Sequence, residues 1–180
     1  MSESDAIAEG RAGHGAGTAA AELVAVAAAL AEHVARGSPG RWPEEADIVT
    51  RAAAHRMLAL ELVAENADAY ASAVDVLAHP GDNLDVTVAL GRTLLILRRI
   101  GSLAADVAEL CVVAAHESDP DLVADAVCAT FYASAAARAC AHLISINLTT
   151  RREDETLEAA FADAERAAMA AIAAEDAGGD

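Results

Sequence analysis

Three polar side chains on apolar helix faces are the candidates for chemistry in this sequence. Asn66 shares a predicted helix face with Tyr70 and aliphatic residues, so its amide is expected to point inward. Asp125 lies on a second apolar stripe, one turn inside its helix, and Asn147 lies near the other end of that helix. A carboxylate can take and return a proton, whereas an amide can orient a substrate. Asp125 is the candidate acid/base, Asn66 a catalytic residue that orients substrate, and Asn147 a substrate contact. Alternatively, a carboxylate near a helix start only complements the helix dipole.

The spacing of Asp125 and Asn147 limits what they can do together. They lie 22 residues apart on one predicted helix, which is roughly 33 Å along a straight helix. They cannot form one site within one chain. They approach each other only if a second chain packs antiparallel to the first.

The glycine-rich segment from Gly13 to Gly17 is a second feature that can bind a ligand. It is not a dinucleotide fingerprint, because no strand precedes it and its spacing differs. It does bring backbone N–H groups and a helix N-terminus together, where an anionic or polar ligand can bind. Gly15, Gly17 and Thr18 are therefore candidate lining residues. The alternative is a flexible leader with no ligand.

Several other chemistries are excluded by what the sequence lacks. It contains no lysine, which excludes Schiff-base catalysis. It contains no Glu-x-x-His or His-Glu-x-x-His motif, which excludes a di-iron carboxylate site and a helical zinc peptidase. Its three cysteines (Cys111, Cys128, Cys140) form no C-x-x-C pair and lie in apolar stretches, which is typical of buried thiols. The sequence therefore predicts no metal site.

The elements that position these residues are predicted to be helices. Hydrophobic residues make up 55% of the chain and aromatic residues only 3%, and the apolar content is mostly alanine, the strongest helix former. Helices are expected over residues 18–36, 44–78, 84–116, 119–148 and 152–175, with a bend or split at Gly101-Ser102 left open. We therefore predict an all-α fold, an antiparallel bundle of about five long helices. Residues 1–17 are expected to be a flexible leader and residues 18–176 a single domain.

The helix over residues 119–148 also predicts self-association. From Ala133 to Ala141 nearly every side chain is small, so this part of the helix is apolar on all sides. Such a helix must be buried on all sides. Either a central place in the bundle or a twofold axis between two chains achieves this, and we favour a homodimer.

Charge and hydropathy restrict the partners and the compartment. The formal net charge of −17 argues against nucleic acid, because a phosphate backbone requires a basic stripe. The N-terminus is acidic and glycine-rich, unlike a signal peptide. The longest apolar stretch, residues 126–148, is interrupted by Arg138 and His142, so no membrane span is expected. These features predict a cytoplasmic protein.

Taken together, these segments resemble the cyclodeaminase/cyclohydrolase family, which includes the helical domain of formiminotransferase-cyclodeaminase and bacterial methenyltetrahydrofolate cyclohydrolases. Residues 15–20 (GAGTAA) resemble the family's G-G-G-S-V-A-A opening, and Ala69-Tyr70 resembles the Ala-Phe of its D-x-x-A-F motif. Residues 125–148 resemble its S-D-A…N-V-x-I-N-L helix without a gap. The resemblance covers about residues 13–172, and the last motif is the most specific.

The resemblance implies an all-α homodimer that binds folate near the glycine-rich opening and the subunit interface. It also implies chemistry on the one-carbon unit that bridges N5 and N10 of tetrahydrofolate. A cyclohydrolase adds water to the cationic methenyl carbon and opens the ring, whereas a cyclodeaminase closes the ring from the formimino form and expels ammonia. Both reactions need a positioned acid/base. Tyr70 is on this basis a candidate substrate contact.

The sequence departs from the family motifs at positions that bear on this chemistry. Asn66 replaces the aspartate of D-x-x-A-F and cannot take a proton or offset a cation. Leu143 replaces the first asparagine of N-V-x-I-N-L. The lysines that usually follow the first helix are absent, and Arg36 or Arg41 can replace their charge from a different position. His33, in the same last turn, is included with Arg36 as a candidate substrate contact.

Three interpretations stay open. The leading one is a diverged enzyme that acts on a folate one-carbon unit or a related small heterocycle, repurposed for a cyclisation or one-carbon step in a biosynthetic pathway. The second is an ordinary methenyltetrahydrofolate cyclohydrolase or cyclodeaminase. The third is a non-catalytic dimeric helical protein that serves as a binding or scaffold module. In the first two, a tetrahydrofolate derivative is the substrate or ligand.

Overall fold

The computed structural model describes residues 2–79, 83–148 and 155–177. Its elements are α1 (Glu3–Ala8), α2 (Ala16–Gly37), α3 (Glu45–Ala78), α4 (Asn83–Glu117), the 3-10 turn η1 (Pro120–Leu122), α5 (Val123–Asn147) and α6 (Glu155–Ala177). These described ranges contain no strand. The predicted all-α class with five long helices is therefore confirmed, and a short sixth helix precedes them.

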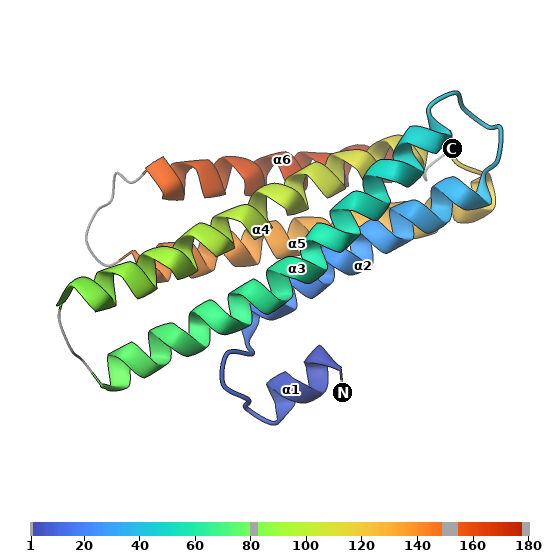
Figure 1. Cartoon of the computed structure of the whole chain (residues 1–180). Helices are drawn as coiled ribbons and strands as arrows, with labels where there is room; N and C mark the ends of the chain where they lie inside the picture. The colour runs from blue at the N-terminus through green and yellow to red at the C-terminus, as the bar shows by residue number, and fades with distance from the viewer. Residues whose placement is uncertain (1, 80–82, 149–154, 178–180) are drawn as a thin grey trace.

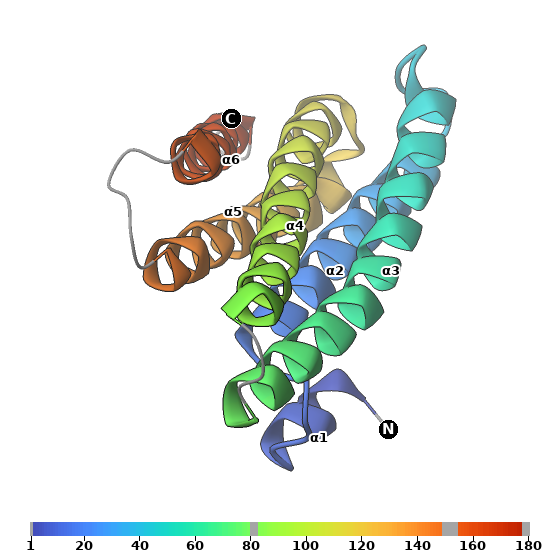
Figure 2. The ribbon, with the colours of Figure 1, turned by 60° about the vertical axis from the view of Figure 1, so that its left-hand side comes forward.

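The five long helices run antiparallel in chain order (Figure 1). α2 and α3 form a hairpin on one side of the bundle, and α6 packs against α4 and α5 on the side away from α3 (Figure 2). α5 contacts α2, α4 and α6. The helix that carries Asp125 and Asn147 therefore lies among three others.

Alanine dominates the buried core and lets the helices approach closely. Ile100 and Ile144 are among its largest fully buried side chains. α4 continues through Gly101 and Ser102 without a break. A Cβ at Gly101 would lie 3.4 Å from the Cβ of Cys140 on α5. This glycine therefore permits close packing of α4 on α5 and does not end the helix.

The N-terminal segment has more local structure than the flexible leader expected over residues 1–17. Ser2 caps α1 in a capping box with Asp5, which satisfies two backbone N–H groups. α2 begins at Ala16, with Gly15 as its N-cap, and not at Thr18. The helix starts earlier than expected because the Thr18 hydroxyl bonds back to Gly15 and does not itself cap the helix. Figure 1 shows α1 beside the N-terminal end of α2.

One face of α5 is not covered within a single chain. Its exposed residues include Cys128, Phe131, Tyr132, Ala135 and Arg138. Of the two ways to bury this helix on all sides, a central place within one bundle is not realised, because α2, α4 and α6 leave this face open. For the same reason Cys128 is exposed, contrary to the expectation of three buried thiols, while Cys111 and Cys140 are buried.

Two segments of the bundle are long and apolar enough to cross a membrane by length and composition, namely 16–37 and 120–147. Within their most apolar stretches, 61% and 50% of the residues are buried inside the fold. Core helices of a bundle have the same composition, so these two segments are weak evidence for a membrane span.

Candidate ligand-binding site

A partly enclosed cavity of about 150 Å³ lies where the loop before α2 meets α3, α4 and α5. Its lining residues are His14, Gly15, Ala16, Gly17, Asn66, Tyr70, Thr93, Leu97, Leu143 and Asn147. The structure thus brings together the predicted site residues Gly15, Gly17, Asn66, Tyr70 and Asn147. These come from segments far apart in the sequence.

The first turn of α2 forms one wall of the cavity. The Thr18 hydroxyl accepts a hydrogen bond from the Gly15 N–H and donates one to the Gly15 carbonyl, both at 2.9 Å. Thr18 is itself fully buried, so it holds the turn from behind. Because the N-cap residue is glycine, no N-cap side chain accepts a hydrogen bond from the N–H groups of this turn. The backbone N–H groups of the first turn have no partner further back in the helix, and the positive end of the dipole favours a ligand atom with partial negative charge.

Asn66 on α3 closes the cavity opposite this turn. Its side chain is 3% exposed, and its Oδ1 atom has no hydrogen-bond partner. A Cβ at Gly17 would lie 2.7 Å from the Asn66 Nδ2 atom. Only glycine at position 17 therefore lets the amide approach the helix. An unpaired buried acceptor costs about 1–3 kcal/mol, so a ligand that donates a hydrogen bond to Oδ1 would recover this energy.

Two other polar side chains of the cavity donate hydrogen bonds to carbonyl groups of their own helices. The Asn147 Nδ2 atom donates to the Leu143 carbonyl at 2.8 Å. The Thr93 hydroxyl donates to the Ala89 carbonyl at 3.2 Å. Tyr70 is 46% exposed, so its ring lies at the mouth of the cavity and not in its depth.

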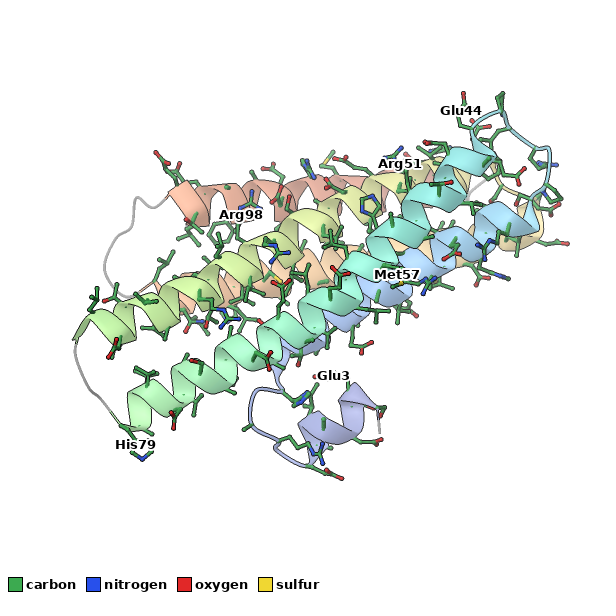
Figure 3. All side chains as sticks on the ribbon, in the orientation of Figure 1. Glu3, Glu44, Arg51, Met57, His79 and Arg98 are labelled. Atoms are coloured by element: carbon green, nitrogen blue, oxygen red, sulfur yellow. The ribbon has the colours of Figure 1, made fainter. Side chains whose placement is uncertain are left out.

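His14 enters the cavity from the loop and is held from outside by α1. Its Nδ1 atom lies 2.9 Å from both carboxylate oxygens of Glu3. The Glu3 side chain is only 10% exposed in this contact. Figure 3 labels Glu3 on the side of α1 that faces the bundle. Among the lining residues, His14 carries the one imidazole, whose two ring nitrogens can donate and accept hydrogen bonds.

Three predicted site residues lie elsewhere. Asp125 is at the opposite end of α5, where its Oδ2 lies 4.0 Å from Nε2 of His33, with both side chains at least half exposed. Arg36 pairs with the buried Glu32 at 2.7 Å. α5 begins at the end of the bundle where α2 ends (Figure 1). Asp125, His33 and Arg36 therefore do not line the cavity of their own chain, as the helix length between Asp125 and Asn147 requires.

Sequence reasoning missed five lining residues. Two of them, His14 and Ala16, lie inside the glycine-rich segment that was already identified as a candidate binding feature, so their position in the sequence could have indicated them. Leu143 was noted only as a departure from a motif. Thr93 and Leu97 lie in an apolar helix with no motif, and only the packing of α4 against α3 and α5 places them at the cavity.

The described ranges contain no cluster of three or more His, Cys, Asp or Glu side chains with the geometry of a metal site. The cavity lining itself includes no carboxylate and no thiol. The groups that can act on a ligand there are the amides, the hydroxyls, the imidazole and the N–H groups at the start of α2.

Comparison with known proteins bears on the family and on the fold. The formiminotransferase-cyclodeaminase family model matches residues 4–167. One similar solved structure is a formiminotetrahydrofolate cyclodeaminase from Thermotoga maritima, with a TM-score of 0.81 and 20% sequence identity. The match covers 91% of this chain and 86% of that chain. Among curated proteins, none matches this sequence.

Proposed function

Because this chain belongs to the formiminotransferase-cyclodeaminase family, we propose that its cavity binds a tetrahydrofolate derivative or a related small heterocycle, and that the protein acts on the one-carbon unit of that ligand. The observation that carries the proposal is the buried Asn66 amide, whose Oδ1 atom has no partner. It lines a cavity together with the uncapped start of α2.

The polar groups of the cavity suit one edge of a pterin ring. Such an edge carries N–H donors beside a carbonyl oxygen. The Asn66 Oδ1 atom can accept from an N–H group, and the first turn of α2 can donate backbone N–H groups to the oxygen. Leu97 and Leu143 supply the apolar surface against which a flat ring packs.

The volume of the cavity fits the ring system of a folate but not the whole molecule. Pockets for drug-sized ligands have volumes of roughly 300–1,000 Å³, whereas this one measures about 150 Å³. It can enclose a ring system, and the rest of a folate would extend past the mouth near Tyr70. A second copy of the chain would cover that part of the ligand if it lies at a subunit interface.

The lining favours a diverged enzyme over one that retains the family's usual acid/base. Asn66 stands where the family motif has a carboxylate, and no Asp or Glu lines the cavity. A repurposed cyclisation or one-carbon step is consistent with this neutral pocket. Asp125 can serve it only from a second copy, because it lies roughly 33 Å along α5 from Asn147 in its own chain.

We also propose that the protein is a cytoplasmic homodimer. The uncovered face of α5, with Phe131 and Tyr132 both 41% exposed, is the supporting observation. Apolar faces of this kind are commonly covered by another protein surface. Burial of this face against a second copy would enclose the small residues of α5 on all sides.

The test is a titration of purified protein with 5,10-methenyltetrahydrofolate, followed through the absorbance of the methenyl group. We expect binding, and loss of the chromophore above the buffer rate. Asn66→Leu removes the amide at similar volume and should weaken binding about tenfold or more, the cost of one lost hydrogen bond. Asp68→Asn, at an exposed position of the same helix, is the matched control and should bind as the parent does.

The possible results separate the interpretations. Binding with turnover that Asp125→Ala abolishes supports an acid/base shared between copies. Binding without turnover contradicts action on the methenyl group and supports a binding module or a site that acts on another folate derivative. Absence of binding by the parent protein contradicts the proposed ligand.

A further inference from the structure

We propose that His14, oriented by Glu3, is the acid/base of the cavity and replaces the carboxylate that position 66 lacks. The inference rests on the proposed function for its substrate, but its geometry can be tested without one. His14 is then a catalytic residue, and Glu3 is a positioning residue that acts through it.

The contact between the two side chains determines which imidazole nitrogen carries the proton. The Glu3 carboxylate, when ionised, can only accept hydrogen bonds, so Nδ1 of His14 must be the donor. In the neutral ring Nε2 then keeps its lone pair. His14 lines the cavity, so Nε2 is the atom available to a ligand or to a water molecule beside it.

The loop that carries His14 is fixed on α3 by close backbone contact. Gly13 has a φ of +87°, and a Cβ there would lie 2.3 Å from the Ala67 carbonyl oxygen. The His14 N–H donates to the Arg11 carbonyl at 3.1 Å. These contacts hold the backbone just before His14 against Ala67, the residue that follows Asn66 in the chain. The acid/base and the amide therefore approach one ligand from neighbouring positions.

Few other ionisable groups face His14. Glu3 approaches from α1, and the Tyr70 phenol lines the cavity from α3. The lining residues from α2, α4 and α5 carry no ionisable side chain. The imidazole, held by Glu3 on one nitrogen, is thus the general acid/base that the lining offers.

The reaction can be written for hydrolysis of a cationic methenyl carbon. Nε2 takes a proton from water as the water oxygen bonds to the carbon and the C=N π electrons move to nitrogen. The imidazolium then returns this proton to N5 as the C–N5 bond breaks. The hydroxyl on carbon loses its proton to solvent as C=O forms, so the net products are the formyl compound and one proton. Glu3 stabilises the imidazolium between the two steps.

The kinetic test compares the parent protein with His14→Gln, Glu3→Gln and Glu3→Asp, using 5,10-methenyltetrahydrofolate. His14→Gln should lower kcat about 100-fold or more, as removal of a general acid/base does, with Kd changed less than about threefold. Glu3→Gln should lower kcat with KM unchanged, and Glu3→Asp should restore part of the loss. His79→Gln, an exposed histidine paired with Asp75, is the matched control. An unchanged kcat in His14→Gln would overturn the proposal.

A second measurement needs no substrate. ¹⁵N chemical shifts of the His14 ring should show a protonated Nδ1 and an unprotonated Nε2 in the neutral form, and Glu3→Gln should mix the two tautomers. A neutral ring that carries its proton on Nε2 in the parent protein would overturn the proposed hydrogen bond from His14 to Glu3. If the parent protein fails to bind the folate while the ring shows the expected tautomer, the proposed substrate is wrong and the acid/base pair stands.

Discussion

The side-chain amide of Asn66 occupies the space that a side chain at position 17 would need. A Cβ at Gly17 would lie 2.7 Å from Asn66 Nδ2 and 2.8 Å from Oδ1. The two residues belong to α2 and α3, so the packing of one helix on the other sets the position of the amide. The shape of the cavity therefore depends on the absence of a single methyl group.

Gly17→Ala should damage the ligand site more than the fold. The new methyl group must displace the amide, so we expect methenyltetrahydrofolate to bind about tenfold or more weakly. Overpacking of this kind typically lowers the free energy of unfolding by about 1–3 kcal/mol. Ligand titration and urea denaturation measure the two effects. Gly91→Ala is the control: nothing lies within 4 Å of a Cβ there, and it should gain about 0.5–1 kcal/mol of helix stability. Equal binding by Gly17→Ala and the parent would contradict this account.

The ion pair between Glu32 and Arg56 should stabilise the α2–α3 hairpin. Glu32 is 6% exposed, and the Arg56 Nε atom donates to its Oε2 at 3.0 Å. Arg56→Met leaves the carboxylate with only the exposed Arg36, so the free energy of unfolding should fall by about 1–3 kcal/mol. Arg51→Met breaks an exposed pair with Asp47 and should cost less than about 1 kcal/mol. Similar losses in both variants, measured by denaturation, would show that burial of Glu32 makes no difference.

The three cysteines should differ strongly in reactivity. Burial raises the pKa of the Cys111 thiol and of the Cys140 thiol to about 12, so neither forms a thiolate near neutral pH. Cys128 is exposed on α5. Ellman's reagent should therefore titrate one thiol in the native protein and three after denaturation, and Cys128→Ser should remove the native reaction.

The same reagent tests the proposed dimer. If two copies pair through the face that holds Phe131 and Tyr132, labelling of Cys128 should slow as the protein concentration rises. A labelling rate independent of concentration, together with a monomeric mass in sedimentation, would contradict pairing through α5.

The stability of the bundle should fall with pH below about 6.5 because of His55. Burial is the main cause that lowers the pKa of this half-buried histidine from its ordinary value of 6.5, against the opposing effect of Asp106. The unfolded state then binds the proton more readily than the folded state. The contribution of neutral His55 to the free energy of unfolding is therefore complete above pH 6.5, and it is lost as the pH falls through the lower pKa of the folded state. His55→Gln should flatten the dependence of the unfolding free energy on pH in this range, and His79→Gln should not.

The sequence alone determined the class of fold and its helices. The high alanine content and the low aromatic content predicted an all-α fold, and the five long helices that we expected lie close to the observed bounds. These signals are local, because helix propensity and chain breaks act within a few residues. The apolar helix faces and the glycine-rich segment also indicated Asn66, Asn147 and Gly17 as candidates, and the family motif added Tyr70.

Tertiary packing decided which candidates share a site. The cavity depends on α2, α3, α4 and α5 meeting at one end of the bundle, which separates Asn147 from Asp125 and adds His14 and Thr93. A single sequence contains the periodicity of each helix but not the rotation and contact of one helix against another. Those are set by the sum of many weak packing contacts between distant residues. The pairing of Glu3 with His14 is of this kind, because only the docked loop brings the two side chains together.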